Sequence, residues 1–188
     1  ISAGSATVTG SLTSARVDTP VVSTSALTSG HILSSGTITS ASISVGAVSA
    51  ASISTTGAAQ VGTNLAAATA SVGQLTVTNG IQLTGGALTA SNILSSGVVT
   101  AGQISASSVT AASITAQSLT VTNLANAIGG ISSASGVTAA SVSTSGSVTV
   151  TTTLSVAGSV QVASLSVTGG MMQVVDLTAS GALTAGSI

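Results

Sequence analysis

Residues 86–124, GALTASNILSSGVVTAGQISASSVTAASITAQSLTVTNL, decide the fold because their large aliphatic residues recur at intervals close to five. On an α-helix, five residues advance the chain by about 500°, so successive members leave any single face. On a straight strand, residues five apart point to opposite sides. All can face one interior only if the backbone bends about once per pentad, which predicts an all-β solenoid or β-helical fibre. The series is Leu88, Ile93, Val98, Ile104, Val109, Ile114, Leu119 and Leu124.

The same spacing extends outward in both directions from this stretch. The pentads align best when their five positions are, in order, a small residue, a Ser-like residue, a large aliphatic residue, Ser or Thr, and another small residue. We expect the central aliphatic side chain to point inward and the residue two before it to share the interior. The register slips by one between Val98 and Ile104. The further series are Val17, Val22, Leu27 and Ile32; Ile38, Ile43, Val48 and Ile53; and the pair Leu183 and Ile188.

The chain divides into an N-terminal segment and a repetitive shaft. Residues 1–35 contain three of the four titratable side chains, Arg16, Asp18 and His31, and the single proline, Pro20. We therefore predict an irregular cap or docking segment there. Residues 36–188 are predicted to form the shaft, with breaks near 60–74, 127–136 and 169–176. Since the first residue is Ile1 rather than Met, we expect a processed product or a segment of a longer chain.

The composition excludes several classes of function. Of 188 residues, 44% are hydrophobic, none is aromatic and 2% are charged, whereas globular proteins average about 25% charged. A net charge of −1 with no Lys gives no electrostatic footprint for nucleic acid and no polybasic membrane patch. No apolar run approaches the roughly 20 residues of a membrane-spanning helix. We therefore predict neither nucleic-acid binding nor membrane insertion.

Few side chains offer chemistry. Asp18, His31 and one of the many serines match a catalytic triad only in residue type, which carries no weight in so Ser-rich a chain. Arg16 and Asp18 can form a surface ion pair, with docking between subunits as the alternative use. Asp176 is expected to be exposed, and a lone Asp is a poor metal site. Met171-Met172 fills a gap in a turn or forms an adaptable contact. We predict no catalytic, cofactor-binding or metal-binding residue, and no cofactor.

Pentads such as Ala41–Val45 and Ala112–Ala116 resemble pentapeptide-repeat proteins. That resemblance implies a right-handed, four-sided β-helix. The chain departs from the family at the position before the central aliphatic, where Ser replaces the Asp or Asn of the family. The phrases Leu75–Gly80 and Leu119–Leu124 also look like the shafts of virus and phage fibres. That second resemblance implies three chains wrapped into one trimeric β-structure.

The leading hypothesis is a structural fibre or filament protein, exposed outside a cell or on a virion, that binds copies of itself. A near-zero charge favours self-association, either as a homotrimer or as a head-to-tail polymer. The alternative is a surface-binding solenoid, such as an ice-binding protein with a Thr array. Its Thr-x-Thr motifs recur at uneven intervals, which argues against one aligned array. A DNA mimic would need an acidic surface, and the chain has two acidic residues. The Thr-x-Thr motifs named above centre on Val8, Ile38, Val77, Val121 and Val150.

Overall fold

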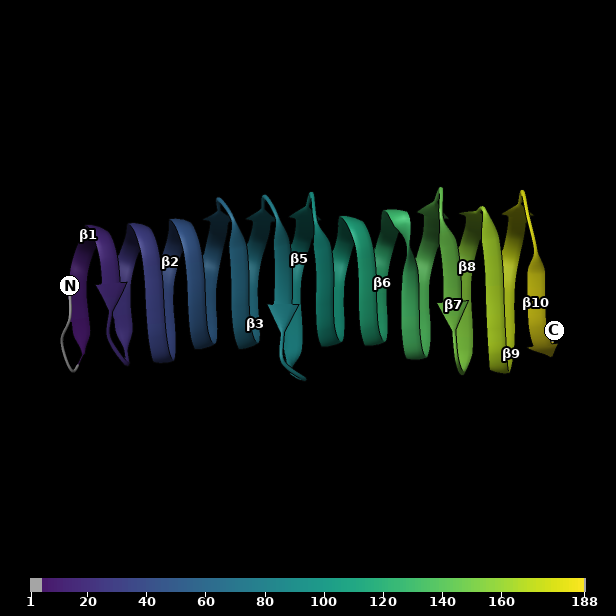
Figure 1. The fold of residues 1–188 in the computed structure, drawn as a ribbon, viewed down its shortest axis with the longest axis horizontal. Coiled ribbons are helices and arrows are strands. Elements are labelled where there is room, and N and C mark those ends of the chain that lie inside the picture. Colours follow the sequence, from purple (N-terminus) through teal and green to yellow (C-terminus); the bar gives the residue numbers. More distant parts are fainter. Residues whose placement is uncertain (1–4, 188) are drawn as a thin grey trace.

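The computed structural model describes residues 5–187 as one row of stacked β-coils with the two termini at opposite ends (Figure 1). The structure is all-β, with 88% of residues in strands, and the coils make a solenoid of about 11 turns. This confirms the predicted fold class. Between residues 5 and 187 there is no helix long and apolar enough to cross a membrane.

Between residues 5 and 187, ten strands make up the parallel sheet, and several of them continue through more than one coil. The longest, β2 and β6, have 40 and 47 residues. The order of the strands along the sheet follows the chain closely, as expected when each coil pairs with the next. The strands are β1 (Ala6–Asp18), β2 (Val22–Val61), β3 (Asn64–Val77), β4 (Gly80–Leu83), β5 (Ala87–Ser95), β6 (Val98–Thr144), β7 (Ser147–Val150), β8 (Thr153–Val162), β9 (Ser164–Ala179) and β10 (Leu183–Ser187).

Each coil contributes three inward-pointing aliphatic positions. In one coil these are held by Leu65, Ala70 and Leu75, which pair in parallel register with Ile81, Leu88 and Ile93 of the next. The cross-section is therefore three-sided, and the four-sided section implied by the pentapeptide-repeat resemblance is wrong. A coil takes 15 residues where Leu12 pairs with Leu27 and 18 where Ala70 pairs with Leu88.

Three axial columns of side chains form the core, and we number the outer faces of the strands that carry them I, II and III. Side chains of each column stack along the axis on the strand spacing of about 4.8 Å. Column I is Val17, Ile32, Val48, Leu65, Ile81, Val99, Ile114, Ile131, Val148, Leu165 and Leu183. Column II is Ala6, Val22, Ile38, Ile53, Ala70, Leu88, Ile104, Leu119, Val137, Leu154 and Met172. Column III is Leu12, Leu27, Ile43, Ala59, Leu75, Ile93, Val109, Ala125, Val142, Val160 and Leu177.

The second interior residue of each pentad follows the large aliphatic residue instead of preceding it. Leu88 and Ala90 are both buried, and so are Ile43 and Val45, whereas Ala41 is exposed. The predicted position two before the aliphatic is therefore wrong. Residues two apart share a side only within one straight strand, and the chain turns its corner about two residues before the aliphatic residue, where two consecutive residues such as Ala41 and Ser42 are both exposed.

Two residues of the predicted inward series point outward. Val98 is 46% exposed while Val99 is fully buried, and Leu124 is exposed while Ala125 is buried. In both cases the preceding corner uses one residue more than the pentad allows. The slip therefore lies between Ile93 and Val99, before the place where the sequence predicts it.

The last two members of the aliphatic series lie at or beyond the C-terminal end of the described residues. Leu183 belongs to column I by its pairing with Leu165. It is exposed because no described coil covers it. Ile188 lies outside the described residues.

Parallel pairing continues through the predicted N-terminal segment with a register shift between Val8 and Ser11, and through residues 169–176 with a register shift between Val174 and Asp176. β1 pairs with β2 from Ala6 opposite Val22 to Asp18 opposite Leu33, so this segment carries the ladder. Its role as a cap or docking segment stays a prediction. Residues 127–136 lie within β6 and residues 169–176 within β9, whereas β2 ends at Val61 and β3 begins at Asn64.

Buried hydroxyl groups close many of the corners. Every buried polar side chain among the described residues is a Ser or Thr two positions after a column residue. Ser34 Oγ donates to the Pro20 carbonyl of the preceding coil at 2.8 Å and accepts from the Gly36 amide at 3.3 Å. No buried side-chain N or O atom in residues 5–187 lacks a partner. Such hydroxyls satisfy corner backbone groups that a buried turn would otherwise leave unpaired. The group comprises Thr19, Thr24, Ser29, Ser34, Ser40, Thr55, Ser95, Ser133 and Thr144.

Glycine lets neighbouring corners stack closely. A Cβ atom at Gly97 would overlap the carbonyl group of Asn79 in the preceding coil. Gly85 has a φ of 77°, a conformation that costs glycine little. The corners therefore depend on residues without side chains as much as the core depends on aliphatic ones.

Candidate functional surface

The titratable residues of the N-terminal segment lie on the outside of face I. Arg16 Nη2 lies 3.3 Å from Asp18 Oδ2, and both side chains are exposed. A surface pair of this kind contributes about 0–1 kcal/mol. His31 lies beside Arg16 in the next coil and is exposed. The structure thus brings Arg16, Asp18 and His31 to one face, without joining the His31 side chain to Asp18 or to any described serine by a hydrogen bond.

Asp176 and the methionine pair lie at the other end of the solenoid, in β9. Asp176 is exposed on face III, opposite Ser159 of the preceding coil. Met171 is exposed, while Met172 continues column II and packs against the core. In the part of the chain that the structure describes, no three His, Cys, Asp or Glu side chains come together to hold a metal ion.

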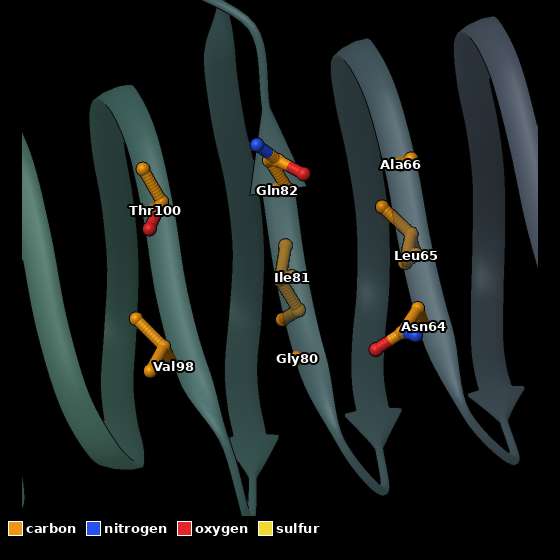
Figure 2. A pocket seen from close by; sticks show the side chains of 8 residues that line it. All are labelled: Asn64, Leu65, Ala66, Gly80, Ile81, Gln82, Val98 and Thr100. Atoms are coloured by element: carbon orange, nitrogen blue, oxygen red, sulfur yellow. The ribbon is translucent and has the colours of Figure 1, made fainter.

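A hollow of about 480 Å³ lies on face I, where it is lined by residues of three successive coils. Figure 2 shows the residues around it: Asn64 from β3, Gln82 from β4 and Thr100 from the start of β6. Gly80, which has no side chain, lies between Asn64 and Val98 in the neighbouring coils (Figure 2). Amide and hydroxyl groups line it, but it contains no ionisable group, and it opens widely to solvent. It offers hydrogen bonds without the enclosure typical of a small-molecule site.

The most regular chemical feature is a line of hydroxyl groups on face II. Directly after the first ten column II residues, from Ala6 to Leu154, ten successive coils place a Ser or Thr that points outward, whereas Gln173 follows Met172. We call these residues the hydroxyl row. Faces I and III have no such continuity, since Leu33, Ala66, Gln82 and Leu94 occupy the equivalent positions there. The hydroxyl row is Thr7, Ser23, Thr39, Ser54, Ser71, Thr89, Ser105, Thr120, Thr138 and Ser155.

Sequence reasoning missed this row because it looked for Thr-x-Thr motifs. Those motifs fall on all three faces: Thr120 follows column II, Thr76 follows column III and Thr149 follows column I. The row becomes visible only when the chain is divided into groups of three pentads with coils of 15 to 18 residues. Its uneven intervals in sequence reflect the changing coil length, and the hydroxyls still align in space.

Comparisons with known proteins identify no relative: no family model, no curated protein and no solved structure matches the chain. They give no support to a relationship with pentapeptide-repeat proteins or with virus fibres.

Proposed function

We propose that the chain is a structural module of a fibre or filament, assembled from copies of itself and displayed outside a cell or on a virion. The observation that carries the proposal is the axial core. Three columns of side chains run unbroken from end to end, and every coil supports its neighbours through parallel pairing. A stack of this kind is a stiff rod with nearest-neighbour contacts only.

The solenoid supplies surfaces for end-to-end contact. Among the described residues, β1 lies at one end of the ladder and β9 with β10 at the other. An unpaired parallel edge accepts a further strand. At the C-terminal end, Met172, Val174 and Leu177 are inward-facing residues that are only partly buried. A neighbouring copy that covers them gains apolar burial as well as backbone hydrogen bonds.

Single-chain coils stacked end to end fit the core better than three wrapped chains. Each coil fills its own interior, since its three column residues come from one chain and are buried there. The low net charge supports contact between copies, because it removes long-range repulsion.

The test is the size of the assembly of the intact chain. We expect negative-stain images to show polymers longer than the single rod, which has about 11 turns and a length of roughly 50 Å. Boiling in detergent should yield monomers and a ladder of shorter oligomers. Uniform single rods would contradict self-assembly, and a detergent-resistant trimer would contradict end-to-end stacking.

A pair of variants tests where the copies meet. Leu177→Glu places a charge on the partly buried apolar end, whereas Thr178→Glu places it on the outer surface of the same strand. We expect the first to shorten the polymers and the second to leave their length distribution unchanged. Equal lengths in both variants would place the contact elsewhere.

The proposed location has its own test. Antibodies raised against the purified chain should label intact producing cells or virions without permeabilisation. Labelling only after lysis would contradict display on a surface.

A further inference from the structure

The backbone pairing of successive coils fixes the positions of the residues in the hydroxyl row. Their alignment therefore does not depend on long, flexible side chains. Direct parallel pairing joins Thr7 to Ser23, Ser54 to Ser71, Ser71 to Thr89, Thr89 to Ser105, and Thr138 to Ser155. Thr39 and Thr120 hold the same place in their coils, directly after the buried residues Ile38 and Leu119. The row therefore repeats at the spacing of the rungs, about 4.8 Å.

The hydroxyls of the row are free. None of the ten makes a hydrogen bond with a described residue, whereas every buried hydroxyl at a corner makes at least one. Eight of the ten are exposed, and Ser23 and Ser155 are half-buried. A donor and acceptor at each rung thus remains available to solvent or to a ligand.

A second, partial row lies beside the first. The residue before the column II residue is also outward-facing, and in six coils it carries a hydroxyl group. Ser52 Oγ and Thr37 Oγ1 in neighbouring coils lie 3.0 Å apart and form a hydrogen bond. Two residues along a strand span about 6.6 Å, so face II presents hydroxyls in two dimensions. The partial row is Ser5, Thr37, Ser52, Thr69, Ser118 and Thr153.

The chemistry of face II excludes most classes of ligand. The face carries no charge over the ten coils of the row, so neither phosphate backbones nor ionic partners find a counter-charge. The chain has no Phe, Trp or Tyr on which a sugar or a base could stack, and its one imidazole, His31, lies on face I. Protein interfaces favour aromatic residues, Met and Arg at their centre, and the hydroxyl row has none of these.

An ordered array of water molecules is the ligand that such a face matches. Water needs only donors and acceptors at regular intervals, and the row supplies one hydroxyl per rung. The rigid backbone fixes these groups before binding, which removes much of the entropic cost of ordering them. The γ-methyl groups of the Thr members add apolar contacts and restrict the side-chain rotamers.

We infer that face II binds ice, with the hydroxyl row as the site that meets the water lattice. This activity is separate from the rod-like assembly, and each can fail without the other. The inference predicts thermal hysteresis and faceted ice crystals in a solution of the purified chain.

Matched variants on two faces test the site. Thr89→Tyr with Thr120→Tyr places two bulky rings in the hydroxyl row on face II. Thr76→Tyr with Thr110→Tyr places the same rings on face III, at the equivalent positions directly after column III residues. All four threonines are exposed, so both double variants should retain the circular dichroism spectrum and melting temperature of the native chain.

We expect the face II variant to lose most of the thermal hysteresis and the face III variant to retain it. Absence of hysteresis in the native chain would overturn the inference. Equal loss in both double variants would also overturn it. If the face II variant instead dissociates an oligomer of a chain that does not shape ice, the row is an interface between copies and the assignment to ice is wrong.

Discussion

At the scale of the residue, the fold depends on small side chains at the corners. Most column positions hold a large aliphatic residue, and the next inward position accepts another aliphatic side chain or a hydroxyl. Where it is a hydroxyl, the group bonds to corner backbone. Polar residues thus enter the core of this chain only where they satisfy a turn.

Ser34→Ala tests the contribution of a corner hydroxyl. The change removes the bond to the Pro20 carbonyl and leaves the Gly36 amide without its side-chain acceptor. We expect a loss of about 1–3 kcal/mol in the free energy of unfolding, since a partner is left unsatisfied. Ser35→Ala is the control, because Ser35 is exposed and its hydroxyl group makes no hydrogen bond with a described residue. Equal denaturation midpoints for the two variants would show that the corner bonds contribute nothing.

Gly97→Ala tests the close stacking of corners. The added methyl group would overlap the Asn79 carbonyl, and overpacking of this kind costs about 1–3 kcal/mol. At Gly10, by contrast, an added Cβ meets no described atom within 4 Å. Thermal melts should therefore show a lower midpoint for Gly97→Ala and little change for Gly10→Ala. The reverse order would contradict the proposed packing.

At the scale of the element, the residues between two corners decide which side chains enter the core. The sequence predicts the inward positions of Ile104, Val109 and Ile114, because five-residue steps separate them. It misplaces Val98 because Val98 and Val99 are equally suited to burial. The choice depends on how the corner from Ser95 to Gly97 stacks on the preceding coil, and a local pattern cannot reveal that contact.

The register of β6 leads to opposite expectations for two adjacent valines. Val99→Asp places an unpaired charge in the core and should cost several kcal/mol, or unfold the neighbouring coils. Val98→Asp places the same charge on the surface and should change the melting temperature little. Circular dichroism and urea titration of the two variants decide the matter. Greater damage from Val98→Asp would restore the register predicted from sequence.

The candidate surface could be predicted only in part. Asp176 is exposed as predicted, but not by simple strand alternation, since the preceding Val175 is exposed as well. The hollow beside Gly80 and the hydroxyl row could not be foreseen, because both join residues from successive coils. Their alignment depends on coil lengths that range from 15 to 18 residues, and these lengths are set by contacts between coils.

At the scale of the whole molecule, contacts join each coil mainly to its immediate neighbours. Stability should then behave as a sum over coils and their interfaces. A complete coil can in principle be removed if the two flanking coils meet in register. The three columns and the hydroxyl row would continue across the junction.

Deletion of residues 131–147 is the corresponding prediction. Ile131 pairs with Val148, so the deletion brings Val148 into the place of Ile131 after Gly130. We expect a folded β-rich chain with a slightly lower melting temperature. Deletion of residues 131–139 removes about half a coil and should disrupt the columns beyond it. Similar circular dichroism spectra and melts for both deletions would contradict a core of aligned columns.

Because of the three columns, the length of the molecule is proportional to its number of coils. Each group of about 16 residues adds one rung, and each rung adds about 4.8 Å, whatever its neighbours contain. Gaining or losing such groups would change the reach of the rod in equal increments while its girth stayed constant. A duplication of one such group in the gene would therefore lengthen the rod by one fixed increment.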